Sequence, residues 1–244
     1  MGTNKESDSK LGILPALTPG NIEIVEMEVH NHPKYGKNRN GKQLDTYFHD
    51  KKKNSCFDEV VHKIMLIDYT NSTQLQRHKK DLSIFTLADR ITKMVDFDER
   101  VENGDLDLVA ELAWQKSDPS TDDSESDNQK KKRDHINLFS FATKYCHYHN
   151  RISYGNDHYS IYDNVVADAI RYYLDDVTHH AITKMRNDRN YRDYHMLLSR
   201  IIEKHHLNEI KGIRYKLDHF LWFPNKMAFY ENGGCIIKKQ AKQS

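Results

Sequence analysis

Two ionisable side chains near the middle of the chain, Lys144 and Asp163, have the best placement for chemistry. Lys144 belongs to the segment 135–149, HINLFSFATKYCHYH, which has no Pro or Gly and is predicted to form one central helix. On a helical wheel this helix is apolar on two sides, and Lys144 falls in the narrow polar sector that remains. An amine in a partly desolvated site has its ammonium form disfavoured, and a nucleophilic lysine requires this. In the alternative interpretation, Lys144 extends along the helix to water.

Asp163 is predicted to lie at or near the first turn of the next helix. That helix opens at Tyr159, after a loop over 150–158 that contains Gly155. Free backbone amides and the helix dipole favour a carboxylate at such a position. Asp163 is therefore either an ordinary helix cap or an ionised carboxylate held beside a developing positive charge.

Two polar stretches are candidates for contact with a polyanion. Residues 117–134 carry an acidic half followed by a basic half and no apolar side chain, which predicts a mobile insertion or linker. Alternatively, its basic half grips phosphates while the acidic half shields it. The polar turn from Asn71 to Gln74 is interpreted first as a cap for the following helix. The phosphate-contact candidates are Asn71, Gln74, Lys130, Lys131, Lys132 and Arg133.

Three stretches of the chain resemble a known family. The stretches FSFATKYCHYHN (139–150) and YSIYDNVV (159–166), followed by YKLDHFLWFPNK (215–226), are similar to bacterial proteins related to the helix-hairpin-helix and 8-oxoguanine-type DNA glycosylases. These include proteins directed against phages with modified DNA. The resemblance is sharpest over 139–166 and extends over 135–244.

The resemblance implies a helical base-excision enzyme that flips a nucleotide out of double-stranded DNA and cleaves its N-glycosidic bond. A role in antiviral defence against phages with modified cytosines would follow. Asp163 matches the residue that stabilises positive charge on the sugar, and Lys144 is the candidate for attack on the anomeric carbon in members with lyase activity. DNA is the implied partner, and no cofactor is implied.

Aromatic side chains would form the walls of the base pocket, because stacking recovers part of the cost of base extrusion. The candidates, each with burial in the core as its alternative, are Tyr145, Tyr148, Tyr162 and Trp222.

The sequence departs from the family in three places. No Leu-Pro-Gly-Val-Gly-like hairpin precedes the central helix, so residues 130–133 would have to bind phosphates in its place. The loop before Asp163 lacks proline, and the chain has three cysteines where an iron–sulfur cluster needs four.

Two other classes of function compete with this interpretation. A nucleic-acid-binding protein or helical ribonuclease-like toxin is suggested by RNYRDYH (189–195), in which Arg189 and His195 stand six apart on a predicted helix. A metal enzyme is suggested by 15 histidines. However, neighbouring histidines on a helix point in different directions and no HExxH occurs, so no metal site is predicted.

The elements that must position these residues are predicted to be mainly α-helical, in a bundle similar to that of the glycosylases named above. Apolar spacing of three and four predicts helices from Phe57, over Ile84–Val95 and over Leu106–Trp114, and later over 191–206 and 214–223. A short strand is predicted over Ile22–Val29 and a loop over Asn31–Asn54. The predicted divisions are a flexible tail (1–20), an N-terminal helical part (21–116), the charged insertion (117–134) and a C-terminal helical part with the candidate site (135–244).

Composition supports helices and sets limits on function. With 5 Pro and 10 Gly, compact helices are favoured over a turn-rich sandwich. A formal charge of +1 gives no strong overall attraction to nucleic acid, so any such site depends on local clusters of cations. Widely spaced cysteines predict neither a disulfide framework nor a CxxC zinc site. Because no apolar run reaches about 20 residues, we expect no membrane span. We also expect a cytoplasmic monomer.

Overall fold

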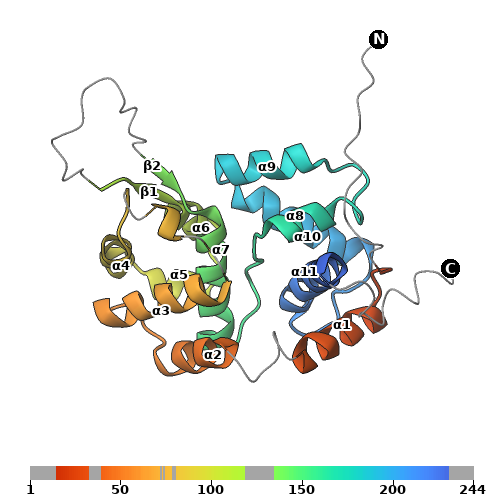
Figure 1. Cartoon of the computed structure of the whole chain (residues 1–244), viewed down its shortest axis with the longest axis horizontal. Helices are drawn as coiled ribbons and strands as arrows, with labels where there is room; N and C mark the ends of the chain where they lie inside the picture. The colour runs from red at the N-terminus through yellow and green to blue at the C-terminus, as the bar shows by residue number, and fades with distance from the viewer. Residues whose placement is uncertain are drawn as a thin grey trace, which may run out of the picture.

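The computed structural model describes residues 15–32, 40–71, 73, 75–78, 81–118 and 135–230, apart from the side chains of residues 40, 41, 76 and 225–230. These parts are mainly helical, as predicted, with one short β-ribbon (Figure 1). The elements in chain order are α1 (Pro19–Asn31), α2 (Asn40–Asp50), α3 (Phe57–Asn71), the 3₁₀ turn η1 (Leu75–His78), α4 (Ile84–Lys93), α5 (Phe97–Glu102), α6 (Asp107–Ala113), β1 (Trp114–Lys116), β2 (His135–Asn137), α7 (Phe139–Tyr148), the π-helical turn η2 (His149–Ser153), α8 (Asn164–Ile170), α9 (His179–Asp188), α10 (Tyr191–Lys204) and α11 (Ile213–Tyr230).

The helices pack in two sets that follow chain order only in part (Figure 1). In one set, α3 contacts α2, α4 and α7, and α6 contacts α5 and α7. In the other, α8 contacts α9 and α11, and α9 contacts α10. The N-terminal α1 belongs to this second set because it packs on α11, while α10 contacts α6 and so joins the two sets. In Figure 1, α7 lies between them.

The predicted strand over Ile22–Val29 is wrong, because this segment lies within α1. Thr18 caps the helix, and Ile22, Val25 and Val29 are buried on one face. Their spacing of three and four residues is helical, whereas the β-branched side chains of the segment favoured a strand. Packing of this face against α11 decides between the two.

The predicted loop over Asn31–Asn54 is also wrong in part, because it contains α2. Leu44 and Phe48 lie four residues apart and are buried together. Two apolar positions among many Lys, Asn and Gly residues give too weak a period to indicate a helix.

The central helix is displaced toward the C-terminus relative to its prediction over 135–149. His135–Asn137 form β2, which pairs antiparallel with β1, Gln115 lying opposite Ile136. The helix then starts at Phe139 and continues through η2 to Ser153, so the loop that carries Gly155 begins and ends later in the chain than predicted.

The remaining predicted helices are confirmed as α3, α4, α6, α10 and α11, with ends that move by a few residues. The helix predicted to open at Tyr159 begins instead at Asn164. Within the described ranges, every helix is too short or too polar to span a bilayer.

Candidate functional site

The Lys144 side chain is buried in the interior and does not reach water. Only 4% of Lys144 is exposed, and its Nζ donates a hydrogen bond to the backbone oxygen of Asn71 at 3.2 Å. The same Nζ lies 3.5 Å from Oδ2 of Asp163. The structure therefore brings together the two ionisable groups that the sequence singled out, although 19 residues separate them in the chain.

Asp163 is a helix cap, the first of the two interpretations that the sequence left open, and it also lies next to the Lys144 amine. It is the N-cap residue of α8, and its Oδ1 accepts a hydrogen bond from the Val165 backbone N–H at 2.9 Å. Its other oxygen, Oδ2, faces Lys144. Because 31% of the Asp163 side chain is exposed, the carboxylate lies between the buried amine and solvent.

An extended segment, Tyr159–Tyr162, leads into Asp163 and is held by α7 on one side. Thr143 accepts a hydrogen bond from the Tyr162 backbone N–H at 3.0 Å, and Ser140 donates to the Tyr162 carbonyl at 3.1 Å. These bonds use the backbone groups that a helix would have used, which is why α8 starts after the segment.

Helix α10 holds the same segment from the other side. The Tyr191 hydroxyl accepts a hydrogen bond from the Ser160 backbone N–H at 2.7 Å and donates to the Ser160 carbonyl at 2.9 Å. The Tyr194 hydroxyl donates to the Ile161 carbonyl at 2.7 Å. Fixed from both sides, the segment sets the position of the Asp163 carboxylate relative to Lys144.

Asn71 and Tyr148, both predicted site residues, lie together at this pair. The backbone oxygen of Asn71 accepts from Lys144, and its side-chain oxygen accepts a hydrogen bond from the Tyr148 hydroxyl at 2.7 Å. Asn71 ends α3, so the C-terminal end of this helix contributes to the site. Asn71 therefore contacts Lys144 through its backbone and Tyr148 through its side chain.

Asp218 of α11 is a further member of the site that sequence reasoning missed. Its Oδ1 is shielded from solvent and accepts no hydrogen bond within the described part of the chain. Burial raises the pKa of the Asp218 carboxyl to about 7, with the charge of Asp163 raising it further and the charges of His219 and Lys144 lowering it. A single Asp in an apolar helix carries no sequence signal, so only the fold reveals it.

The other predicted pocket residues are buried in the core or lie apart from Lys144 and Asp163. Tyr145 is fully buried and donates a hydrogen bond to Asn54 at 2.6 Å. Tyr162 is 2% exposed and packs edge-on against Phe139. Trp222 is half-buried on α11. Among the four aromatic side chains predicted to line the base pocket, Tyr148 is connected to the Lys144–Asp163 pair, because it shares Asn71 with Lys144 as a hydrogen-bond partner.

Tyr145 belongs to a second buried polar cluster. The Asn54 amide donates to Asp98 at 2.7 Å, and the ring of His149 lies 3.4 Å from the same carboxylate. Lys63 donates to Asn54 at 3.2 Å, and burial lowers the pKa of Lys63 to about 8. This cluster ties α3 and α5 to the start of η2, which makes it structural support for α7.

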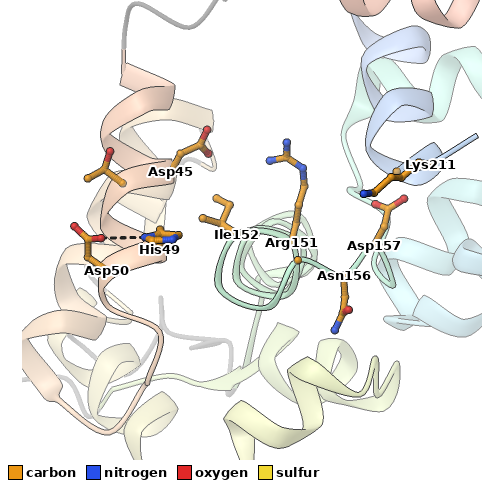
Figure 2. A pocket seen from close by; sticks show the side chains of 11 residues that line it. Asp45, His49, Asp50, Arg151, Ile152, Asn156, Asp157 and Lys211 are labelled. Carbon is orange, nitrogen blue, oxygen red and sulfur yellow. Dashed lines mark hydrogen bonds and ion pairs between the residues drawn. The ribbon is translucent and has the colours of Figure 1, made fainter.

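A groove of about 710 Å³ opens beside η2 (Figure 2). Arg151 projects into it and stacks on the ring of Tyr215 at 3.6 Å. The lining residues are Asp45, Thr46, His49, Asp50, Arg151, Ile152, Gly155, Asn156, Asp157, Lys211 and Gly212.

Charges of both signs line this groove. Burial raises the pKa of Asp45, and Arg151 partly counteracts that rise. Asp157 accepts hydrogen bonds from the backbone N–H groups of Arg214 and Tyr215, which caps the start of α11. The groove is therefore polar without a strong preference for anions.

Several other predicted residues are not placed at the site. Gln74 and the basic run at 130–133 lie outside the described residues. His147 is buried with a ring nitrogen 2.8 Å from the Tyr159 carbonyl, and its Nε2 has no partner among the described residues. No group of three His, Cys, Asp or Glu side chains in the described ranges is arranged to hold a metal ion.

The ribonuclease-like motif at 189–195 does not lie on one helix, which corrects that prediction. Arg189 ends α9 in a left-handed conformation with φ of 58°, and α10 begins at Tyr191. Its guanidinium stacks on Trp114 at 3.7 Å. A ring nitrogen of His195 lies 3.0 Å from the His158 carbonyl, and burial lowers the pKa of His195 to about 4.

The chain belongs to the HI_0787_N family, whose model, described as an N-terminal domain, matches residues 21–153. This match includes Lys144 and stops ten residues before Asp163. An uncharacterized protein of Haemophilus influenzae is 29% identical over 147 residues, which is 60% of this chain. The alignment spans 59% of that relative's length. No solved structure matches the chain significantly.

Proposed function

We propose that this protein is a DNA glycosylase that cleaves the N-glycosidic bond of a modified or damaged base in duplex DNA. The observation that carries the proposal is the 3.5 Å separation between Nζ of Lys144 and Oδ2 of Asp163. A buried amine and a partly exposed carboxylate at a helix N-terminus supply a nucleophile and a stabilising charge within one nucleotide's reach. The resemblance of residues 139–150 and 159–166 to DNA glycosylases implies the same roles for these two residues.

Cleavage of a glycosidic bond needs a stabilising negative charge. As the bond between C1′ and the base nitrogen breaks, the bonding electrons leave with the base and positive charge develops on the sugar. A fixed carboxylate next to that charge lowers the barrier. Asp163 is suited to this, because its side chain is partly exposed and the Val165 amide fixes the position of its Oδ1. The target base has to leave the duplex before it can reach Asp163.

The group that attacks C1′ distinguishes two outcomes. If the Lys144 amine attacks, its lone pair forms a bond to C1′ and an imine intermediate follows, from which the strand can be nicked. If water attacks, an abasic site is left. The proposal includes both, and the choice is measurable.

The test uses duplex oligonucleotides that contain 8-oxoguanine or a modified cytosine, incubated with the protein and then heated in alkali. Asp163→Asn is the informative variant, since Asn also caps helices well and the change removes the charge with little effect on α8. We expect the excision rate to fall by about 10²–10³-fold. Asp168→Asn, at a carboxylate further along the same helix, is the matched control and should leave the rate unchanged.

Borohydride trapping decides between the two nucleophiles. Lys144→Ala is expected to abolish a trapped covalent adduct, whereas an adduct that persists assigns the attack to another amine. Intact strands from every modified duplex after alkali would refute the proposed function.

A further inference from the structure

The C-terminal end of α9 carries two arginines that lie on aromatic rings rather than beside carboxylates. The guanidinium of Arg189 is 3.7 Å from the ring centre of Trp114, and that of Arg186 is 6.0 Å from the ring centre of Tyr162. Among the described residues, no carboxylate lies within ion-pair distance of either arginine. Arg186 is exposed and Arg189 is half-buried, so both are in contact with solvent.

Positive charge is in excess at this end of α9. Over residues 184–189 the chain has three cations, Lys184, Arg186 and Arg189, and one carboxylate, Asp188. Asp188 is bound by Lys184, one turn earlier on the same helix. The charges of Arg186 and Arg189 are therefore left for a partner outside the chain.

The stack on Trp114 prepares Arg189 to bind a phosphate. A guanidinium is planar, so when its face lies on a ring its N–H groups remain free at the edge, where they can donate two parallel hydrogen bonds to phosphate oxygens. The ring of His135 is stacked on the same indole at 4.4 Å. Because Trp114 is already engaged by Arg189 and His135, this surface suits a phosphate better than a stacked base.

Strand β1 adds a third cation to the same surface. Side chains two residues apart on a strand lie on the same face. Trp114 and Lys116 are both exposed, whereas Gln115 between them is buried. Lys116 therefore lies on the face that carries Trp114 and Arg189, and we call Lys116, Arg189 and Arg186 the cationic edge.

The cationic edge leads to the candidate site. The side-chain amide of Asn137 on β2 donates to the Arg186 carbonyl at 3.0 Å, which ties the β-ribbon to the end of α9. Arg186 lies over Tyr162, the residue before Asp163, and α9 packs on α8, which Asp163 caps. A strand that follows the edge from Lys116 past Arg186 thus arrives at the partly exposed Asp163 carboxylate.

We propose that Lys116, Arg189 and Arg186 bind backbone phosphates of duplex DNA beside the nucleotide that enters at Asp163. The inference rests on the proposed function. Contacts to the backbone fix the position of a duplex without reading its sequence. The three side chains would therefore hold DNA of any sequence, while the choice of base is made elsewhere.

The first experiment measures binding of an unmodified, fluorescent duplex by anisotropy between about 50 and about 200 mM salt. The variants are Arg186→Gln and Arg189→Asn, because asparagine tolerates the left-handed conformation in which Arg189 ends α9. Each is expected to lower the slope of log K against log salt by about one, and to weaken binding about tenfold near 0.1 M salt, equally for two unrelated sequences. Arg200→Gln is the control with an unchanged slope, because Arg200 is bound by Asp176 at 2.6 Å.

Thermal unfolding of the same variants separates binding from stability. A lower melting temperature with an unchanged salt slope would overturn the inference, since the arginines would then only stabilise the end of α9. Slope changes confined to single-stranded DNA would overturn the assignment to a duplex.

The second experiment measures base release from a modified duplex in single turnovers at increasing protein concentration. The half-saturating concentration should rise about tenfold in Arg186→Gln and in Arg189→Asn. An active wild type whose variants saturate at the same concentration would overturn the inference and leave the proposed function standing. A wild type that binds duplex through these side chains but releases no base would overturn the proposed function and leave the binding surface in place.

Discussion

Removing the Tyr191 hydroxyl is expected to loosen the segment that positions Asp163. This hydroxyl forms two hydrogen bonds with the backbone of Ser160, one to the N–H and one to the carbonyl. Tyr191→Phe leaves both backbone groups buried without their partner, at a cost of about 1–3 kcal/mol for an unpaired group. We expect the free energy of unfolding to fall by about 3 kcal/mol. For a chain of this size that corresponds to about 6–12 °C in melting temperature.

The control for this change is Tyr69→Phe, which removes the same oxygen from a side chain that is 73% exposed. Thermal unfolding followed by circular dichroism gives the two melting temperatures, and urea unfolding gives the free energies. If Tyr191→Phe and Tyr69→Phe are equally stable, α10 does not hold the segment through this hydroxyl. The positioning of Asp163 would then need another explanation.

The remaining predictions concern one buried histidine and two glycines with positive φ. Burial lowers the pKa of His149 to about 4, below its ordinary value of 6.5, so between these values the unfolded chain binds a proton that the folded chain excludes, and stability is lost as the pH falls. When the pH is lowered from 7 to 5, the unfolding free energy of the wild type should fall by about 2 kcal/mol more than that of His149→Gln. Urea titrations at the two pH values measure this difference, and an equal fall in both proteins would contradict the prediction. Gly104 and Gly155 both have φ of 75°, but a Cβ at Gly104 would lie 2.8 Å from His158, whereas one at Gly155 meets nothing within 4 Å. We expect Gly155→Ala to cost about 1 kcal/mol and Gly104→Ala about 3 kcal/mol in the same assay, and similar costs would show that His158 yields easily.

The candidate pair was accessible to sequence reasoning because each member has a local signature. Lys144 is the cation in a narrow polar sector of an otherwise apolar helix, and Asp163 stands where an N-cap is favoured. The sequence did not determine whether Lys144 reached water. That depended on Asn71 at the end of α3, which supplies the carbonyl that holds the amine inside.

The parts that sequence reasoning missed depend on contacts between distant segments. Asp218 is enclosed because α11 packs along α8, and this contact joins segments that are distant in the chain. Tyr145 has the spacing of a pocket wall but lies on the side of α7 that faces Asn54. The β-branched residues of α1 are compatible with a strand or a helix, and the helix is favoured because α11 buries one of its faces.

The packing of α1 on α11 has a consequence for how the protein is made. Glu23 pairs with Lys216 at 2.6 Å and Glu26 with His219 at 2.7 Å, each across 193 residues of chain. The buried face of α1 therefore stays uncovered until almost all of the chain down to α11 has left the ribosome, which takes about 10–40 s at ordinary rates of synthesis. During that interval Ile22, Val25 and Val29, which are buried in the folded protein, lack the surface that covers them. A chaperone that shields this helix during translation should therefore raise the yield of folded protein more than one supplied after release.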